Sequence, residues 1–379
     1  MVQAAYLHIP FCHHICHYCD FNKVFFENQP VDDYLNAMEQ EMKNTVEKHG
    51  VNKLKSIFVG GGTPTALTEP QLDKFLEMIH KHLSLEENGE FTFEANPNEL
   101  TEKKLQLLKD YGVNRLSIGV QTFNDELLKS IGRVHTKKEA IQTIQRAREI
   151  GFENLSLDLM YSLPGQTAED FSQTLQQAFE LDIDHMSAYS LIIEPKTVFY
   201  NLMRRGKLNV PPQEIEAKMY DDLMNKMEEN GFLQYEISNF AKKGFESRHN
   251  LTYWNNEEYY GIGAGAHGYV QGIRRANIGP INKYMDAVSQ SGFAYMEEHE
   301  VTKTEMMEEE MFLGLRKTAG VSKMTFKQKY GVELNDVFGE QVREQMEKGL
   351  LAENEECLYL TREGRFLGNE VFQAFIGVI

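Results

Sequence analysis

The chain lacks the features that would carry it into a membrane or out of the cell. No apolar run approaches the ~18 residues that a membrane-spanning helix needs. No basic stretch precedes the first apolar residues, as it would in a secretory signal peptide. Only 4 cysteines occur in 379 residues, and three of them are clustered too closely to form a disulfide framework with the fourth. We therefore expect a protein without a membrane segment, located in the reducing cytoplasm.

Positive charge is also scarce. Lysine and arginine number 39 against 57 aspartates and glutamates, which gives a formal net charge of -18. An acidic surface repels phosphate backbones, and the sequence has no basic stripe with interleaved aromatic residues. We therefore expect no nucleic-acid partner. The hydrophobic content of 41% and the charged content of 25% are ordinary for a globular protein, and the length predicts two or three domains.

The scarce cysteines are concentrated in one motif. Cys12, Cys16 and Cys19 are spaced C-x3-C-x2-C. Three thiolates this close together can hold one inorganic centre. A cube of four irons held by three thiolates leaves one iron open, and an open iron can bind a second ligand. The spacing therefore favours an iron–sulfur site that also binds a cofactor.

Zinc is the alternative metal. A tetrahedral site of three cysteines could take its fourth ligand from a neighbouring histidine, namely His13, His14 or His17. Structural zinc sites usually combine two separated cysteine pairs, however, and no second pair is present. Cys357 stands alone near the C-terminus, where we expect it to be a small buried side chain.

The first half of the chain alternates β-rich runs with amphipathic helical patterns. This alternation predicts parallel strands joined by crossover helices, forming most of a (β/α) barrel or else a doubly wound sheet. The expected strands cover residues 4–9, 56–59, 91–95, 115–120, 155–160 and 186–191. Polar and glycine-rich residues follow the first five of these strands. Because the carboxyl ends of parallel strands meet at one rim, we expect a functional site there.

The alternation stops after residue 191, and residues 210–212 have the composition of a linker. We expect irregular structure over residues 235–269. Further on, helices over 305–317, 323–330 and 337–348, followed by a strand over 357–361, indicate a small winged-helix-like module. Its acidic run at 308–310 favours packing or partner binding over DNA binding. The predicted domains are therefore 1–200, 201–295 and 296–379.

These motifs resemble those of the radical S-adenosylmethionine (SAM) superfamily. The cysteine spacing with an aromatic residue, Tyr18, before the third cysteine is the signature of that superfamily, and residues 60–64 carry its Gly-Gly-Gly-Thr-Pro pattern. More narrowly, residues 6–12, 60–65, 94–97 and 115–121 are similar to the oxygen-independent coproporphyrinogen III oxidase group. The resemblance covers nearly the whole chain. It implies a partial (β/α)6 radical SAM barrel, an α+β connecting region with the haem motif described below, and a winged-helix-like C-terminal domain.

The resemblance also implies cofactors and site residues. Cys12, Cys16 and Cys19 would hold a [4Fe-4S] cluster whose open iron binds SAM, and reduction of the cluster would cleave a C–S bond of SAM. Matched motif to motif, the amino end of SAM would meet Gly61, Gly62 and Thr63 with Glu94 nearby, and its carboxylate would meet Arg133. Gln121 and Asp158 would hold the ribose, Tyr18 would line the adenine, and Tyr6 would reach the SAM head.

Two kinds of protein divide this group, the oxidases and the haem chaperones of the HemW type. The oxidase motif has a further cysteine where this chain has Phe21, and the oxidases carry an N-terminal arm, whereas here the cysteine motif begins at residue 12. The sequence also has the chaperones' H-N-x-x-Y-W motif, in which the residues implied to bind haem are His249, Asn250, Tyr253 and Trp254. Imidazole is a common haem ligand, so His249 is expected to bind the iron, with His267 as a second candidate.

The expected function is therefore that of a haem chaperone, which binds haem and transfers it to an acceptor protein that the sequence does not identify. A peripheral membrane protein would suit the role of acceptor. SAM cleavage remains open, and the runner-up function is oxidative decarboxylation of coproporphyrinogen in haem biosynthesis. A radical SAM enzyme acting on tRNA is a further alternative, which the net charge of -18 disfavours.

Overall fold

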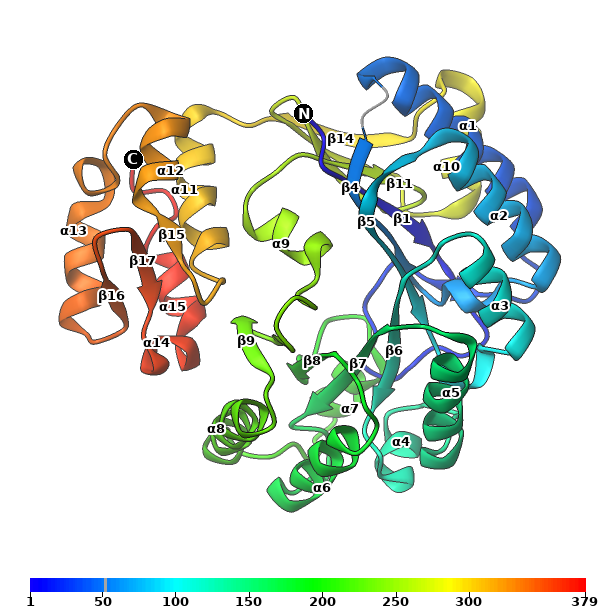
Figure 1. The fold of residues 1–379 in the computed structure, drawn as a ribbon, viewed down its shortest axis with the longest axis horizontal. Helices are drawn as coiled ribbons and strands as arrows, with labels where there is room; N and C mark the ends of the chain where they lie inside the picture. The colour runs from blue at the N-terminus through cyan, green and yellow to red at the C-terminus, as the bar shows by residue number, and fades with distance from the viewer. Residues whose placement is uncertain (51–52) are drawn as a thin grey trace.

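The computed structural model describes residues 1–50 and 53–379. Its centre is a run of six neighbouring parallel strands, which confirms the predicted α/β fold with a partial barrel (Figure 1). These strands are β1 (Ala4–Ile9), β4 (Lys53–Gly61), β5 (Ser84–Ala95), β6 (Arg115–Gln121), β7 (Asn154–Tyr161) and β8 (His185–Ser190). The helices between them are α1 (Val31–His49), α2 (Glu69–His82), α3 (Glu102–Asp110), α4 (Asp125–Ser130), α5 (Lys137–Ile150) and α6 (Ala168–Phe179).

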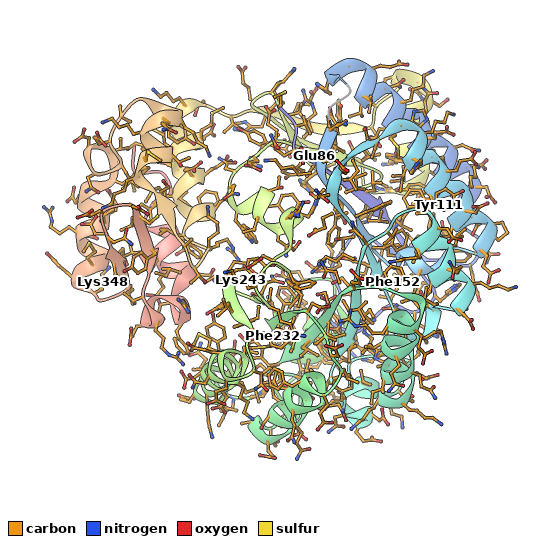
Figure 2. All side chains as sticks on the ribbon, viewed as in Figure 1. Glu86, Tyr111, Phe152, Phe232, Lys243 and Lys348 are labelled. Atoms are coloured by element: carbon orange, nitrogen blue, oxygen red, sulfur yellow. The ribbon has the colours of Figure 1, made fainter. Side chains whose placement is uncertain are left out.

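Local sequence signals explain where the crossover helices begin. Thr68, Thr136 and Thr167 each close a capping box at the start of α2, α5 and α6. Each pairs its side chain with the third helical residue, which satisfies backbone N–H groups that a helix start leaves free. The buried faces of these helices pack against the sheet, and side chains fill the space between the two layers (Figure 2).

The expectation of irregular structure over residues 235–269 is wrong, because this stretch extends the sheet at both edges. At the β8 edge it adds antiparallel strands β10 (Asn239–Ala241) and β9 (Leu233–Glu236). At the β1 edge it adds β11 (Tyr259–Ile262), parallel to β1, and the start of antiparallel β12 (His267–Val270). Beyond this stretch, the antiparallel strands β13 (Ile273–Asn277) and β14 (Tyr295–Glu300) continue the same edge. Over the described residues, 12 strands form one sheet, and its end strands β9 and β14 do not pair with each other.

The remaining elements before residue 300 connect or cover the sheet. They are β2 (Phe11–Cys12), β3 (Val24–Phe25), the 3-10 turns Pro64–Ala66 and Pro97–Glu99, α7 (Val198–Arg204), α8 (Gln213–Glu229), α9 (Arg248–Trp254) and α10 (Ile281–Ser291). The short helix α9 lies between the parallel strands and the C-terminal part of the chain, and it contacts both β4 and α11 (Figure 1). It carries the H-N-x-x-Y-W motif.

The C-terminal part combines helices with a three-stranded sheet, as the winged-helix-like pattern predicted. Its elements are α11 (Lys303–Gly314), β15 (Val321–Ser322), α12 (Lys323–Tyr330), α13 (Leu334–Glu347), β16 (Leu351–Glu353), β17 (Cys357–Leu360), α14 (Arg362–Phe366) and α15 (Gly368–Gln373). It has a hydrophobic core of its own, with Phe326, Phe338 and Leu358 fully buried. The three domain boundaries stay a prediction. No helix in the described part of the chain is long and apolar enough to cross a membrane.

Candidate functional site

The cysteine motif borders a cavity of about 550 Å³ at the rim of the parallel strands. Cys12 closes β2, and Cys16 and Cys19 follow in the loop before β3. All three are free thiols that line the cavity, whereas Cys357 lies in β17 and does not. The three cysteines, which are close in sequence, therefore also line the same cavity in the fold.

The surroundings of Cys12 are tightly fitted. The Thr63 hydroxyl donates to its Sγ at 3.4 Å, and a Cβ on Gly62 would come within 2.9 Å of the same sulfur. Only glycine therefore lets the backbone approach the thiol this closely. Burial raises the pKa of Cys12 to about 12 and also raises the pKa of Cys19. Iron would displace these protons, because the thiolate is the metal ligand.

The strand ends supply the rest of the wall, as predicted. Along each strand every second side chain points toward the cavity, since successive side chains point to opposite faces of a sheet. The inward side chains of β6 are Arg115, Ser117 and Gln121, with Gly119 between the last two. The residues expected for the cluster and SAM that line this cavity are Cys12, Cys16, Tyr18, Cys19, Gly61, Gly62, Thr63, Glu94, Gln121, Arg133 and Asp158.

Arg133 is held in place but has bonding capacity to spare. Its Nη1 donates to the Asn96 side chain at 2.6 Å, while its buried Nε has no hydrogen-bond partner. Asn96 in turn donates to Thr63 Oγ1 at 3.2 Å. A buried guanidinium nitrogen without a partner is costly, and a carboxylate in the cavity would satisfy it.

Two carboxyl groups face the same space. Burial, reinforced by the charge of Asp158, raises the pKa of Glu94 to about 8, and burial raises the pKa of Asp158. Glu94 accepts a hydrogen bond from the Gly61 backbone at 3.1 Å, and Asp158 accepts one from Ser117 at 3.0 Å. A cationic ligand would favour the charged form of both groups. Gln121 has a φ of 67° at the end of β6, a left-handed backbone of the kind that gathers at functional sites.

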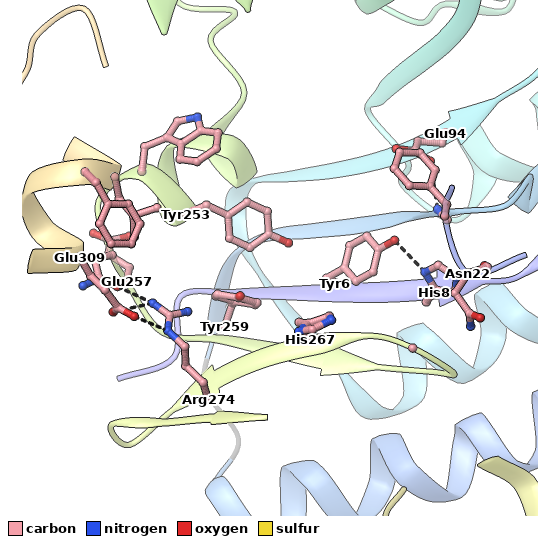
Figure 3. Close-up of a pocket in the computed structure, with 17 residues that line it drawn as sticks. Tyr6, His8, Asn22, Glu94, Tyr253, Glu257, Tyr259, His267, Arg274 and Glu309 are labelled. Carbon is pink, nitrogen blue, oxygen red and sulfur yellow. Dashed lines mark hydrogen bonds and ion pairs between the residues drawn. The ribbon is translucent and has the colours of Figure 1, made fainter. Parts of the chain in front are cut away.

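The prediction for Tyr6 differs from its position in the structure. Tyr6 does not line the cysteine cavity, and its hydroxyl is bonded to His8 Nδ1 at 2.9 Å. It instead lines a second cavity of about 590 Å³ on the other side of Glu94 (Figure 3). Phe21, Gly61 and Glu94 border both cavities, so the two are adjacent and share a wall.

The residues of the H-N-x-x-Y-W motif are divided between the cavities. Asn250 lines the cysteine cavity, whereas Tyr253 and Trp254 line the second one. The Tyr253 ring meets Tyr259 edge-on with ring centres 4.6 Å apart, and the Arg316 guanidinium lies 4.8 Å from the Trp254 ring centre. Aromatic rings thus border the second cavity, and a cation packs on one of them.

His249 lines neither cavity. It is 1% exposed, its Nδ1 is bonded to the Ser56 hydroxyl at 3.0 Å, and its Nε2 is bonded to the Tyr253 hydroxyl at 2.8 Å. Burial, with the nearby Arg115 charge, lowers the pKa of His249 to about 3, so the ring is neutral. Iron ligation through His249 would require one of these bonds to break and the ring to leave the interior. This geometry is that of a structural histidine, so haem ligation by His249 stays a prediction that its contacts do not favour.

Several cavity residues escaped the sequence analysis. Ser117, Ser187 and Tyr189 line the cysteine cavity, and Tyr259 and Arg274 line the second one. Side chains alternate with a period of two along a strand, so counting back from Gln121 on β6 could have identified Ser117. The same alternation on β8 could have paired Ser187 with Tyr189. Nothing local to the sequence marks Tyr259 or Arg274, because the strands that carry them were not predicted.

The residues present fit a [4Fe-4S] cluster with SAM. The three free thiols line the same cavity as Arg133 and Glu94. Arg133 has a buried nitrogen without a hydrogen-bond partner, and burial raises the pKa of the Glu94 carboxyl. Over residues 1–50 and 53–379, no three side chains of Cys, His, Asp or Glu are grouped closely enough to hold a single metal ion. The zinc alternative therefore gains no support from side-chain positions.

Comparisons with known families match both halves of the chain. The radical SAM superfamily matches residues 6–178, and the HemN C-terminal domain matches residues 301–367. Among solved structures, the coproporphyrinogen III oxidase HemN from Escherichia coli superposes with a TM-score of 0.87 at 24% identity, covering 100% of this chain and 91% of the other. That likeness concerns the fold alone.

Curated relatives match along the whole length. The heme chaperone HemW of Bacillus subtilis (strain 168) is 58% identical, over 99% of this chain and 100% of its own. The heme chaperone HemW of Lactococcus lactis is 45% identical, over 99% and 97%. The mouse mitochondrial radical S-adenosyl methionine domain-containing protein 1 is 34% identical, over 92% and 81%.

Proposed function

Since this chain belongs to the HemW family of haem chaperones within the radical SAM superfamily, we propose that it binds haem and transfers it to an acceptor protein. The observation that carries the proposal is the aromatic cavity next to the cysteine cavity. Tyr6, Tyr253, Trp254 and Tyr259 border it. Such rings offer the flat, apolar contact that a porphyrin face needs, with polar edges directed to water. The cavity volume of about 590 Å³ lies within the usual range for a cofactor site.

The adjacent cavity is proposed to hold a [4Fe-4S] cluster on Cys12, Cys16 and Cys19, with SAM beside it. When bound, the reduced cluster supplies the electron that cleaves SAM. Within our proposal, Gly61, Gly62, Thr63 and Glu94 receive the amino group, and the Arg133 guanidinium pairs with the SAM carboxylate. Tyr18 borders the adenine, while Gln121 and Asp158 bond the ribose.

Coproporphyrinogen decarboxylation is the weaker candidate. The oxidases carry a further cysteine where this chain has Phe21, and the Phe21 side chain is 63% exposed at the wall that both cavities share. A phenyl ring there cannot ligate metal. It adds apolar contact instead, which suits a porphyrin in the aromatic cavity better than a fourth thiolate would.

We propose a cytoplasmic protein, because all four of its cysteines are free thiols. Its acceptor is proposed to be a haem protein, including one attached peripherally to a membrane. The formal net charge of -18 favours an acceptor with a basic docking surface and disfavours nucleic acid.

The test is anaerobic and compares two ligands. Protein reconstituted with iron and sulfide is given SAM and a reductant, and then either ferric haem or coproporphyrinogen. We expect a stoichiometric Soret band with haem and no loss of carboxyl groups from coproporphyrinogen. Turnover of coproporphyrinogen, or the absence of haem binding, would overturn the chaperone function.

A further inference from the structure

The aromatic cavity has two faces of different character (Figure 3). One face is the sheet, where β1, β11, β12 and β13 present side chains that include Tyr6, Tyr259 and His267. The opposite face consists of α9, with Tyr253 and Trp254, and of α11, with Glu309 and Phe312. A flat molecule between these faces would contact rings from both.

Among the described residues that line this cavity, one histidine has a ring free for a metal. The ring nitrogens of His8 are bonded to the Tyr6 hydroxyl at 2.9 Å and to the Asn22 carbonyl at 2.8 Å. His249 is buried behind Tyr253, as described above. His267 is exposed, lines the cavity, and makes no ring hydrogen bond or ion pair with any described residue. Its position at the start of β12 is fixed by backbone pairing with Ala276 of β13.

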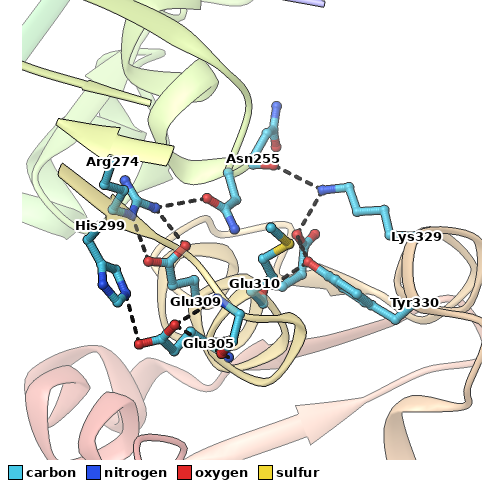
Figure 4. Close-up of polar contacts among 11 residues, drawn as sticks. Asn255, Arg274, His299, Glu305, Glu309, Glu310, Lys329 and Tyr330 are labelled. Carbon is cyan, nitrogen blue, oxygen red and sulfur yellow. Dashed lines mark hydrogen bonds and ion pairs between the residues drawn. The ribbon is translucent and has the colours of Figure 1, made fainter. Parts of the chain in front are cut away.

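The cavity also has a single permanent cation among the described residues that line it, Arg274. Its Nε and Nη2 each donate to a Glu309 carboxylate oxygen at 2.7 Å, and Nη2 also reaches Asn256 Oδ1 at 3.1 Å (Figure 4). This fork-like pairing is the geometry that a guanidinium also offers to any other carboxylate. A haem propionate entering the cavity would therefore compete with Glu309 for Arg274.

Resting on the proposed function that this chain binds haem, we propose that His267 is the axial ligand of the haem iron and that Arg274 binds a propionate. Haem then occupies the cavity between the sheet and α9. Glu309 lies on α11, so a propionate on Arg274 releases the ion pair between Glu309 of the C-terminal module and Arg274 of the sheet. Lys317 and Lys329 still bond Asn255, at 2.6 and 3.1 Å, and hold α11 and α12 near α9.

The experiment separates the two roles by comparing ferric haem with metal-free protoporphyrin IX. Both porphyrins carry propionates, but only haem has iron. His267→Ala should weaken haem binding by about tenfold or more and shift the Soret band, while protoporphyrin binding stays unchanged. Added imidazole should restore the wild-type Soret position. The double variant Arg274→Gln/Glu309→Gln, which leaves no charge unpaired, should weaken both porphyrins by about tenfold and leave the Soret shape intact.

The controls distinguish failure of the His267 assignment from failure of haem binding itself. His299→Ala removes an exposed histidine on β14 that is paired with Glu305, and it should bind haem as the wild type does. If wild-type protein binds no haem, the proposed function fails. If wild-type protein binds haem and His267→Ala leaves the spectrum and affinity unchanged, the ligand assignment is overturned while the function stands. A Soret shift in His249→Asn but not in His267→Ala would return the ligand role to His249.

Discussion

The backbone N–H of Gly61 donates to Glu94 Oε2 at 3.1 Å, and this pair forms part of the wall between the two cavities. Gly61 has a φ of 118°, and a Cβ at this position would come within 2.6 Å of the His8 ring. Any other residue would be strained in the backbone and would collide with His8. The glycine-rich turn after β4 thus lets one carboxylate face the cysteine cavity and the aromatic cavity together.

Replacing Glu94 should change how stability depends on pH. The unfolded chain releases this proton near pH 4.5, whereas the folded pKa is about 8, so the native state keeps the proton between these values. The free energy of unfolding therefore falls as pH rises from about 4.5 to about 8. Glu94→Gln removes this contribution and should show a shallower fall in urea titrations across that window. Glu86→Gln, on the exposed part of the same strand, should follow the wild type, and equal slopes for all three proteins would contradict the prediction.

Replacing any one of the three motif cysteines should abolish the iron–sulfur cluster. Cys12→Ser, Cys16→Ser and Cys19→Ser each leave two thiolates, too few to hold a four-iron cube with one open site. Iron and sulfide analysis after anaerobic reconstitution measures the result. Cys357→Ser is the matched control, because Cys357 lies in β17 away from the cavity, and it should keep a full cluster. Stoichiometric zinc in place of iron in the wild type would refute the assignment.

Arg133→Ala should weaken SAM binding by roughly ten- to a hundredfold, because a charge-assisted contact contributes about 1.5–3 kcal/mol. Arg133 lines the cavity that would take the SAM carboxylate, and its buried Nε has no hydrogen-bond partner. Asp158→Ala should also weaken binding through the loss of a ribose contact. Calorimetry on cluster-loaded protein gives the affinity. Arg343→Ala, on the exposed face of α13, should bind SAM normally, and unchanged affinity in both cavity variants would remove those residues from the site.

The sequence predicted the parts of the fold that depend on local pattern. Strand β1 and helix α12 have the predicted bounds, because a regular apolar pattern ends at a turn or cap in each. The edge strands were missed. In β14, three of six residues are glutamates, so its role in the sheet depends on pairing with β13 and not on an apolar face. Such pairing between distant segments leaves little local signal.

The candidate site also contains residues that the local sequence pattern could place and residues that it could not. Strand ends such as Glu94 and Gln121 could be placed together, since parallel strands present their carboxyl ends at one rim. The contact of Tyr6 with the SAM head stays a prediction: Tyr6 lines the aromatic cavity, and its position near the motif did not reveal the direction of its side chain. His249 could not be judged from its motif either, since its bond to Ser56 joins residues 193 positions apart. The residue types indicated which ligands the site could bind, but the contacts that each side chain makes in the folded protein depend on residues distant in sequence.

His249→Ala should destabilise the protein without changing the colour of bound haem. The ring stacks on Phe58 with centres 5.0 Å apart and satisfies the hydroxyls of Ser56 and Tyr253, so its removal leaves a void and two buried polar groups unpaired. The cost should be about 2–5 kcal/mol in the free energy of unfolding, measured with urea. His299→Ala, at an exposed ion pair, should change that free energy by less than about 0.5 kcal/mol. Tyr253 borders the aromatic cavity and also bonds His249, so any fall in haem affinity should come from a shift of the Tyr253 ring. The Soret position should stay at its wild-type value. Full stability of the His249 variant would show that the ring does not hold α9 in place.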